Sequence, residues 1–482
     1  MSKENFTARN SAHENGNAAS ANVNVSGNVH GNVAASGNGN VNVPATAASA
    51  ATAAPATSPT TSRNATAAAT APVTSAAAPA PATSAPTFLA LVFARNRTAI
   101  VASLVATAIG AIAWIAMLTC GLLATTNMSN IYNWGLLIAI FAFLVGFGAG
   151  AQFLASILYL RDQTRFRNLA CYAQAISLAG GVGAGAAIVA DLGSPKNMLN
   201  MILHPNPQSM LTWDMVALSL FLIVSLVCLV ALARTWKSTK AWMIAGFLAA
   251  LFLQVVEGLL FALNSARTWW HSPIMPIDFI CVAFVCGAAA LVGVCAVSKR
   301  AGGISMARSL SPVLCVAVFV HIVLMAAEFV NLHIENTPAS QQVLHVLGVY
   351  APLYAVELLF PLIAALVLWF TRRRAQHKTF LVSVLVVACG MLAHRMMLLY
   401  PAFAAPTLFV GLSNAPSPEW AYPIATGLYA NNGTAFEMGQ AYIPSVVEAI
   451  SVLLPVGLSI ALILVALNCV FAHMNRSVPA CE

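Results

Sequence analysis

The chain has 482 residues, of which 59% are hydrophobic and only 7% are charged. Soluble globular domains carry about 25% charged residues, so this composition excludes that class and indicates an integral membrane protein. The formal net charge of +8 does not indicate a nucleic-acid partner, because the basic residues lie in short connections between apolar segments. There they fix the topology and meet anionic lipid.

The first 86 residues differ from the rest of the chain. They consist mainly of Ala, Asn, Thr, Ser, Gly and Pro, and they contain almost no large apolar side chains. Such a segment cannot bury enough surface to offset the entropy lost on ordering. It has no signal-peptide pattern, because the first apolar run begins too late. We therefore expect residues 1–86 to form a disordered cytoplasmic tail and residues 87–482 to form a membrane domain.

Ten apolar segments follow the tail, and each exceeds the roughly 20 residues that cross a bilayer core. The sequence therefore predicts an all-α bundle of ten transmembrane helices. We expect these helices to form two four-helix groups plus two additional helices. The long connection 401–442 is expected to lie on the outer surface. The predicted spans are 98–123, 134–160, 168–192, 213–234, 241–263, 276–298, 310–332, 348–371, 379–400 and 443–472.

Lys and Arg are distributed unevenly between the two sets of connections. One set carries only Lys196 and Arg267. The positive-inside rule assigns the other set, and with it both termini, to the cytoplasm of a multi-pass protein of the cell membrane. The connections of this basic set carry Arg161, Arg165, Arg167, Arg234, Lys237, Lys240, Lys299, Arg300, Arg308, Arg372, Arg373, Arg374 and Lys378.

Almost all ionisable residues inside the spans fall in the half of the membrane that this orientation makes the outer one. His321, near mid-span, is the main exception. A charge in a span is costly and by default marks a functional site. The sequence therefore predicts one polar site that faces outward. The residues of this outer half are Asp191, Asp214, Glu257, Asp278, Glu328, Glu357, Arg395 and Glu448.

The ten cysteines form no C-x-x-C, C-x-x-C-H or ferredoxin-type pattern, so we interpret them as small buried hydrophobic residues. His321 and His394 are expected at different depths on different helices, which disfavours a bis-histidine haem. We therefore expect no haem, iron–sulfur cluster or metal in this chain. The glycines of the second and third spans indicate close helix packing, and a close pair can leave a groove for a flat, lipid-like ligand.

Five motifs follow one another along the chain: WGLLIAIFAFLVGFGAGA from Trp134, DLGSP from Asp191, N-P-x-S-x-x-x-W-D from Asn206, R-x-W-W-x-S-P from Arg267 and YIPSVVE from Tyr442. This set resembles the polysulfide reductase membrane-subunit family, also called NrfD-like or PsrC-like. The last motif is similar to its ten-span branch. The resemblance covers most of the chain after residue 130.

The resemblance implies a membrane anchor that oxidises menaquinol, or reduces quinone, near the outer face. It implies electron exchange with a four-cluster ferredoxin-like iron–sulfur subunit, which in turn connects to a molybdopterin catalytic subunit. Quinol oxidation releases protons, and a partly desolvated carboxylate can accept one. Outward carboxylates over an apolar inner half fit this chemistry, since the isoprenoid tail needs an apolar groove.

Asp191 and Glu257 are the predicted proton acceptors of this site. The predicted quinone contacts are Asn133, Gln152, Trp213, Asp214 and Arg267. Some relatives carry a histidine one turn into the second span, where this chain has Gly148, Ala149 and Gly150, and Asn133 and Gln152 are the nearest polar substitutes.

Each of these residues also has a structural interpretation. Asp191 can be an ordinary helix-terminus residue, Trp213 an interfacial anchor and Asp214 an N-terminal cap. Buried ion pairs with Arg395 are an alternative for three more carboxylates: Glu328, Glu357 and Glu448.

Two other classes of function remain open. A secondary transporter would use buried carboxylates, although transporters place their sites at the midplane on broken helices of inverted repeats. A purely structural anchor would hold partner proteins without redox work. In that case, replacing Asp191 or Glu257 would change only assembly.

Overall fold

The computed structural model describes residues 96–129, 132–297, 303–404 and 442–476. The predicted tail, 1–86, and most of the predicted connection 401–442 lie outside these ranges. Within them every regular element is a helix, so the prediction of an all-α protein is confirmed.

Ten helical segments are long and apolar enough to cross a membrane, as predicted. Four short helices, α3 (Leu122–Thr125), η1 (Pro195–Asn197), α6 (Met198–Leu203) and α11 (Pro338–Val349), lie between them. The last span divides into α14 (Val446–Ser451) and α15 (Leu453–Arg476). The other nine spans are α2 (Arg97–Cys120), α4 (Leu136–Arg161), α5 (Gln163–Asp191), α7 (Met210–Arg234), α8 (Thr239–Ala262), α9 (Met275–Val297), α10 (Gly303–Glu335), α12 (Ala351–Thr371) and α13 (His377–Ala404).

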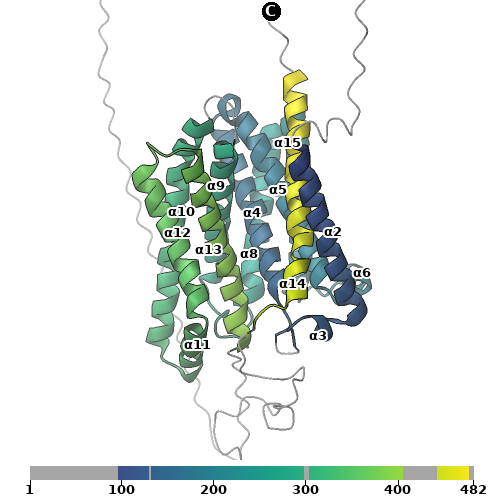
Figure 1. The fold of residues 1–482 in the computed structure, drawn as a ribbon, viewed down its shortest axis with the longest axis vertical. Coiled ribbons are helices and arrows are strands. Elements are labelled where there is room, and N and C mark those ends of the chain that lie inside the picture. Colours follow the sequence, from purple (N-terminus) through teal and green to yellow (C-terminus); the bar gives the residue numbers. More distant parts are fainter. Residues whose placement is uncertain (1–95, 130–131, 298–302, 405–441, 477–482) are drawn as a thin grey trace, which may run out of the picture. The chain divides into compact units, whose positions relative to one another are not determined.

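The spans pack as two groups of four helices and one additional pair. Helices α4, α5, α7 and α8 form the first group, and α9, α10, α12 and α13 form the second. Helix α4 joins the groups, because it packs against both α9 and α13. Helices α2 and α15 lie side by side, and α15 packs on α5 (Figure 1). This arrangement confirms the predicted division into two groups and two additional helices.

Glycine permits the closest helix contacts of the bundle. A Cβ atom on Gly180 of α5 would lie 2.9 Å from the carbonyl oxygen of Leu144 in α4. On the other face of α4, Gly150 meets the backbone of Ala283 and Gly287 in α9. The small residues therefore let α4 approach both the helix beside it in sequence and the second group.

The two ends of the bundle differ in the charges they carry. At one end, called here the carboxylate end, α5, α8, α10 and α13 finish and α4, α7, α9 and α12 begin. It lies at the bottom of Figure 1, with α11 and α14. The opposite, basic end carries the Lys- and Arg-rich connections. Here Asp162 caps α5, because its side chain accepts hydrogen bonds from the backbone N–H groups of Thr164 and Arg165 at 3.1 and 3.0 Å.

Near the carboxylate end, a proline inside α13 is compensated from another element. Pro401 has no N–H, so the carbonyl of Met397 loses its usual helical donor. The indole of Trp269 donates to this carbonyl at 2.9 Å, and the indole of Trp270 donates to the carbonyl of Leu398 at 2.6 Å. The connection between α8 and α9 therefore holds the last turns of α13 in place.

The start of α4 is completed by the other end of the chain. Gly135 provides no side-chain cap, and the N–H of Leu136 donates instead to Oε1 of Glu448 at 2.6 Å. Tyr442 also donates its hydroxyl to Glu448. Burial, followed by the negative charge of Glu448, raises the pKa of Tyr442, so this phenol keeps its proton and remains a donor.

Candidate functional site

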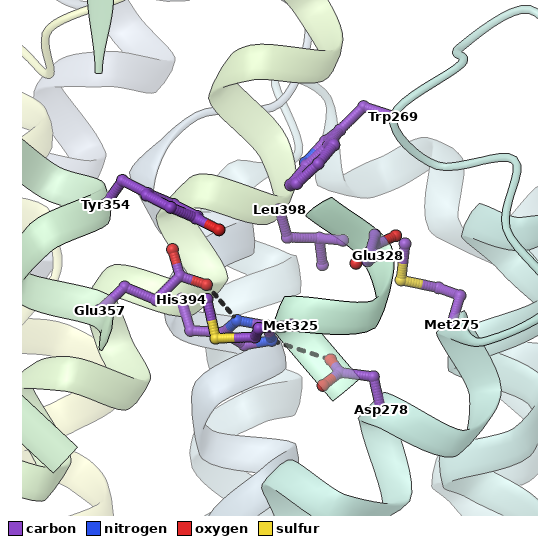
Figure 2. Close-up of a pocket in the computed structure, with 9 residues that line it drawn as sticks. All are labelled: Trp269, Met275, Asp278, Met325, Glu328, Tyr354, Glu357, His394 and Leu398. Carbon is purple, nitrogen blue, oxygen red and sulfur yellow. Dashed lines mark hydrogen bonds and ion pairs between the residues drawn. The ribbon is translucent and has the colours of Figure 1, made fainter. Parts of the chain in front are cut away.

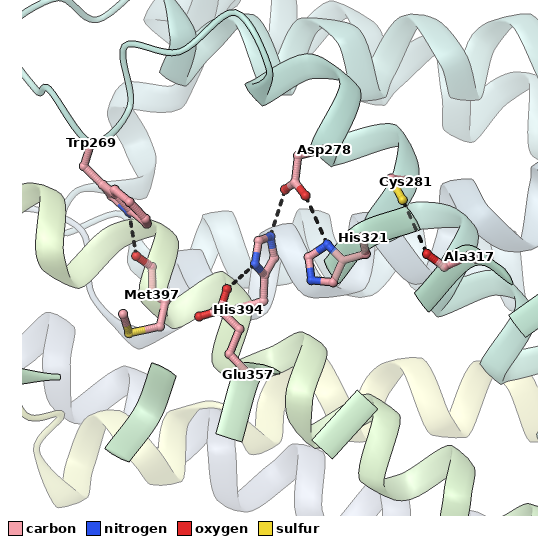
Figure 3. Close-up of polar contacts among 8 residues, drawn as sticks. All are labelled: Trp269, Asp278, Cys281, Ala317, His321, Glu357, His394 and Met397. Atoms are coloured by element: carbon pink, nitrogen blue, oxygen red, sulfur yellow. Dashed lines mark hydrogen bonds and ion pairs between the residues drawn. The ribbon is translucent and has the colours of Figure 1, made fainter. Parts of the chain in front are cut away.

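Four buried side chains from four helices of the second group form a connected network, called here the histidine cluster. Its members are Asp278 of α9, His321 of α10, Glu357 of α12 and His394 of α13 (Figure 3). Asp278 binds both rings: its Oδ1 lies 3.1 Å from Nδ1 of His321, and its Oδ2 lies 2.9 Å from Nε2 of His394. Oε1 of Glu357 lies 2.6 Å from Nδ1 of His394.

His394 has a carboxylate oxygen on each ring nitrogen. A neutral imidazole has one donor and one acceptor nitrogen, so it can satisfy only one of these carboxylates. Without another cation, either the ring carries both protons or a carboxyl group carries one. The cluster therefore concentrates protons or positive charge at a single buried position.

A small cavity of about 20 Å³ lies beside the cluster (Figure 2). This volume holds about one water molecule. Polar side chains on several sides of the cavity can form hydrogen bonds to a water molecule inside it. The cavity is lined by Trp269, Met275, Asp278, Met325, Glu328, Tyr354, Glu357, His394 and Leu398.

The expectation that His321 and His394 lie at different depths is wrong. Their ring centroids are 4.7 Å apart, and both rings bind Asp278. Helix α10 has 33 residues, far more than the roughly 20 that a bilayer core requires. Counting residues from its end therefore misjudged the level of His321.

Arg395 lies between the two helix groups and is fully buried. Its guanidinium stacks over the ring of Phe279 at 4.0 Å, and none of its nitrogens has a hydrogen-bond partner among the described residues. A Cβ on Gly146 of α4 would lie 3.9 Å from Nη2. Arg395 also interacts electrostatically with Asp278 and Glu257, which belong to different groups.

The ion pairs predicted for Arg395 are not formed within the described part of the chain. Glu357 binds His394, and Glu448 binds Tyr442 and the N–H of Leu136. Neutral donors and a histidine therefore reach these carboxylates in place of the guanidinium.

Asp214 of α7 and Glu257 of α8 form a second acidic site, called here the carboxylate pair. Their exposed fractions are only 2% and 1%, and they interact electrostatically. Gln254 donates to Oε2 of Glu257 at 3.1 Å. Oδ1 of Asp214 and Oε1 of Glu257 have no hydrogen-bond partner among the described residues. The pair therefore offers buried acceptor oxygens to a donor outside the chain.

The structure separates Asp191 and Gln152 from this pair. Asp191, at the end of α5, is half-buried and interacts electrostatically with Glu448. Gln152 lies against Gly246, eleven residues before Glu257 and so about 16 Å along α8. It belongs to a neutral network in which its Oε1 accepts from Gln174 at 2.6 Å.

The other predicted contacts lie at the carboxylate end. Asn133 is exposed. Trp213 is 43% exposed and donates to the carbonyl of Pro207 at 2.9 Å. Arg267 donates to the carbonyl of Ala402 at 3.1 Å and stacks on the ring of Phe403. Of the predicted site residues, the described structure thus places Asp214 and Glu257 together inside the bundle.

Sequence reasoning missed the histidine cluster as a unit. Asp278 and Glu357 were recognised as unusual, whereas His394 was considered only as a haem ligand. One usable signal was present, since His394 directly precedes Arg395 inside a span, and two adjacent ionisable residues are costly there.

The fold and these sites define a multi-pass α-helical membrane protein with buried polar centres near one end of its bundle. Residues 124–407, more than half of the chain, match the family described as polysulphide reductase, NrfD. The chain belongs to this family.

Three relatives extend the comparison. A putative dimethyl sulfoxide reductase membrane subunit from Halobacterium salinarum is 29% identical over 46% of this chain and 57% of its own length. A selenate reductase subunit from Mesobacillus selenatarsenatis is 23% identical over 60% of this chain and 78% of its own. An Hdr-like menaquinol oxidoreductase integral membrane subunit from Archaeoglobus fulgidus is 26% identical over 33% of this chain and 41% of its own length. The match thus spans less than two thirds of the first and third relatives.

Proposed function

We propose that this chain is the quinol-reactive membrane subunit of a multi-subunit respiratory reductase. Two relatives bear the names of reductase subunits, and a third bears the name of a menaquinol oxidoreductase subunit. In the proposed reaction, menaquinol loses two electrons and two protons and becomes menaquinone. The electrons pass to a four-cluster iron–sulfur subunit and from there to a molybdopterin subunit.

The carboxylate pair is the observation that best supports this proposal. A buried acceptor oxygen without a partner is costly and calls for a donor from water or a ligand. A quinol hydroxyl is such a donor. Hydrogen-bonded to Oε1 of Glu257 or Oδ1 of Asp214, it can release its proton to the carboxylate as its electron leaves. Gln254 holds the other oxygen of Glu257 and so fixes the orientation of this carboxylate.

Glu257 of the pair also interacts electrostatically with a buried cation, Arg395. Asp214 and Glu257 repel each other when both are ionised, whereas Arg395 attracts the charge of Glu257. We propose Asp191 as a second acceptor, and Asn133, Trp213 and Arg267 as residues at the entrance on the same end.

We propose that the carboxylate end faces the outside of the cell and that both termini are cytoplasmic. The basic connections among the described residues lie at the opposite end, as the positive-inside rule requires of the cytoplasmic side. Reporter fusions after residues near 200, 270 and 340 should be extracytoplasmic. Cytoplasmic signals at all three positions would reverse the orientation.

The test of the quinol site is oxidation of a menaquinol analogue by membranes that contain the complete complex. Glu257→Gln and Asp214→Asn keep size and polarity but remove the acceptor charge. General-base catalysis contributes about 10²–10⁴-fold, so a fall of that order is expected for Glu257→Gln. Glu335→Gln, an exposed carboxylate at the end of α10, is the matched control. Immunoblotting checks assembly, and normal rates in both site variants would favour a purely structural anchor.

A further inference from the structure

The histidine cluster has the donor set of a metal site. Asp278, His321 and His394 each offer one ligand atom, these atoms lie within 4.8 Å of one another, and all three residues are buried. We propose that they bind a divalent first-row transition-metal ion, with zinc as the reference ion for testing. This proposal departs from the expectation, drawn from the cysteine pattern, that the chain holds no metal.

The spacing of the ligands supports such a site. Zinc lies about 2.0–2.2 Å from imidazole nitrogen and carboxylate oxygen, which puts tetrahedral ligands about 3.3 Å apart. The nitrogens of His321 and His394 already lie 3.1 and 2.9 Å from the oxygens of Asp278. An ion bound between the three groups would replace these two hydrogen bonds.

Glu357 supplies the support that metal-bound histidines usually have. A ligating histidine almost always donates its other N–H to a carboxylate, a carbonyl or water, which fixes its tautomer. Oε1 of Glu357 lies 2.6 Å from Nδ1 of His394, so Nε2 keeps its lone pair for the ion. An ion in the cluster also resolves the conflict at His394, because a neutral ring then satisfies Glu357 with a proton and Asp278 through the shared metal.

The cavity leaves room for one more ligand. Its volume of about 20 Å³ accommodates one water molecule between Asp278, Glu357 and Glu328. Three protein ligands plus water leave an open coordination position. Two imidazoles favour zinc, copper, iron or nickel over magnesium and calcium, which prefer oxygen ligands. The buried charge of the ion is offset by Asp278 and Glu357.

Metal analysis of the purified full-length complex tests the proposal without any turnover measurement. The protein is prepared without a polyhistidine tag, and zinc, copper, nickel, cobalt and manganese are measured by mass spectrometry. Iron is measured as the difference between wild type and variant, because the proposed iron–sulfur subunit contributes iron of its own. Stoichiometric metal is expected in the wild type and a loss of more than about tenfold in His321→Ala and Asp278→Asn. His333→Gln, an exposed histidine on α10, is the matched control and should retain the wild-type content.

A second measurement separates a metal site from a structural network. Glu357→Gln keeps all three ligands, and loss of such a supporting carboxylate typically lowers metal affinity 10–100-fold. Cobalt added to the metal-depleted complex should give visible absorption bands in the wild type but not in Asp278→Asn. If His321→Ala fails to assemble, the metal content of the wild-type complex and its cobalt spectrum still test the proposal. Substoichiometric metal and no cobalt signal, or equal metal in all variants, would overturn the proposal.

Discussion

The two helix groups bury acidic side chains near the same end of the bundle but treat them differently. In the first group, Asp214 and Glu257 each keep an oxygen without a hydrogen-bond partner among the described residues. In the second group, Asp278 binds two histidines and Glu357 binds one, although Oε2 of Glu357 also has no hydrogen-bond partner among the described residues. The first arrangement is suited to a ligand that donates a hydrogen bond, such as a quinol hydroxyl. The second holds charge in a fixed network.

Arg395 makes this difference informative, because the same guanidinium interacts with Glu257 of the first group and Asp278 of the second. The two sites therefore share one buried cation, although they differ in hydrogen bonding. A change in charge at either site therefore changes the electrostatic potential at Arg395. Variants in both helix groups can show whether the first group serves proton transfer and the second holds buried charge.

The largest expected effect is on turnover. Asp191→Asn and Glu257→Gln should each lower quinol oxidation by about 10²–10⁴-fold, the usual contribution of a general base. Glu357→Gln and Glu328→Gln should lower it much less. The measurement is quinol-analogue oxidation at matched protein levels. Equal losses in all four variants would show that the groups are not divided by function, and a normal rate for Asp191→Asn alone would restrict the site to the carboxylate pair.

The next largest effect is on stability. Here variants of the second helix group should lose more than variants of the first. His394→Ala removes the partner of both Asp278 and Glu357 and leaves buried charge uncompensated, which costs about 3–5 kcal/mol. Asp214→Asn removes a buried charge that forms no ion pair among the described residues, so it should be neutral or stabilising. Unfolding of the purified complex in detergent measures both. If Asp214→Asn proves the more destabilising of the two, Asp214 has a structural partner and the comparison fails.

A smaller effect is expected where Trp269 supports α13, the helix that carries His394 and Arg395. Trp269→Phe removes the donor to the carbonyl of Met397, and a buried acceptor without a partner costs about 1–3 kcal/mol. Trp213→Phe serves as the control, since that indole is 43% exposed. Thermal unfolding should separate the two variants, and equal midpoints would mean that water replaces the lost bond.

The smallest effect is expected at the basic end. The backbone N–H of Arg165 and the Thr164 side chain hold the pKa of Asp162 below its ordinary value. A carboxylate with a lowered folded-state pKa stabilises the fold above its unfolded pKa, about 3.9, and loses this effect as the pH falls through the folded value. The stability difference between wild type and Asp162→Ala should therefore be present at neutral pH and shrink in acid. A pH-independent difference would contradict the capping role.

The sequence predicted the architecture well because the bilayer imposes it. Long apolar runs have one solution, the helix, and short basic connections force neighbouring helices to be antiparallel. The ends of the helices were less accurate: α10 continues to Glu335 and α13 to Ala404, beyond the predicted 332 and 400.

The site was predicted only in part, because its contacts join helices that are distant in sequence. Hydropathy identified Asp278, Glu357 and Arg395 as costly, but it holds no information on rotation about the helix axis. The partners of Asp278 lie 43 and 116 residues away. Two histidines and a carboxylate at such separations form no motif. Asp214 and Glu257 lie on consecutive spans, and both were predicted as site residues, but their proximity was not predicted.

The bond between Leu136 and Glu448 has a consequence for biogenesis. It spans 312 residues, and two more bonds, from Asn127 to the carbonyl of Ile443 and from Ser445 to the carbonyl of Thr125, span 316 and 320. During synthesis, the residues around the start of the second span therefore lack these hydrogen-bond partners until the last span has been inserted. A chain that stops before Tyr442 lacks Ile443, Ser445 and Glu448 and therefore cannot form any of these three bonds.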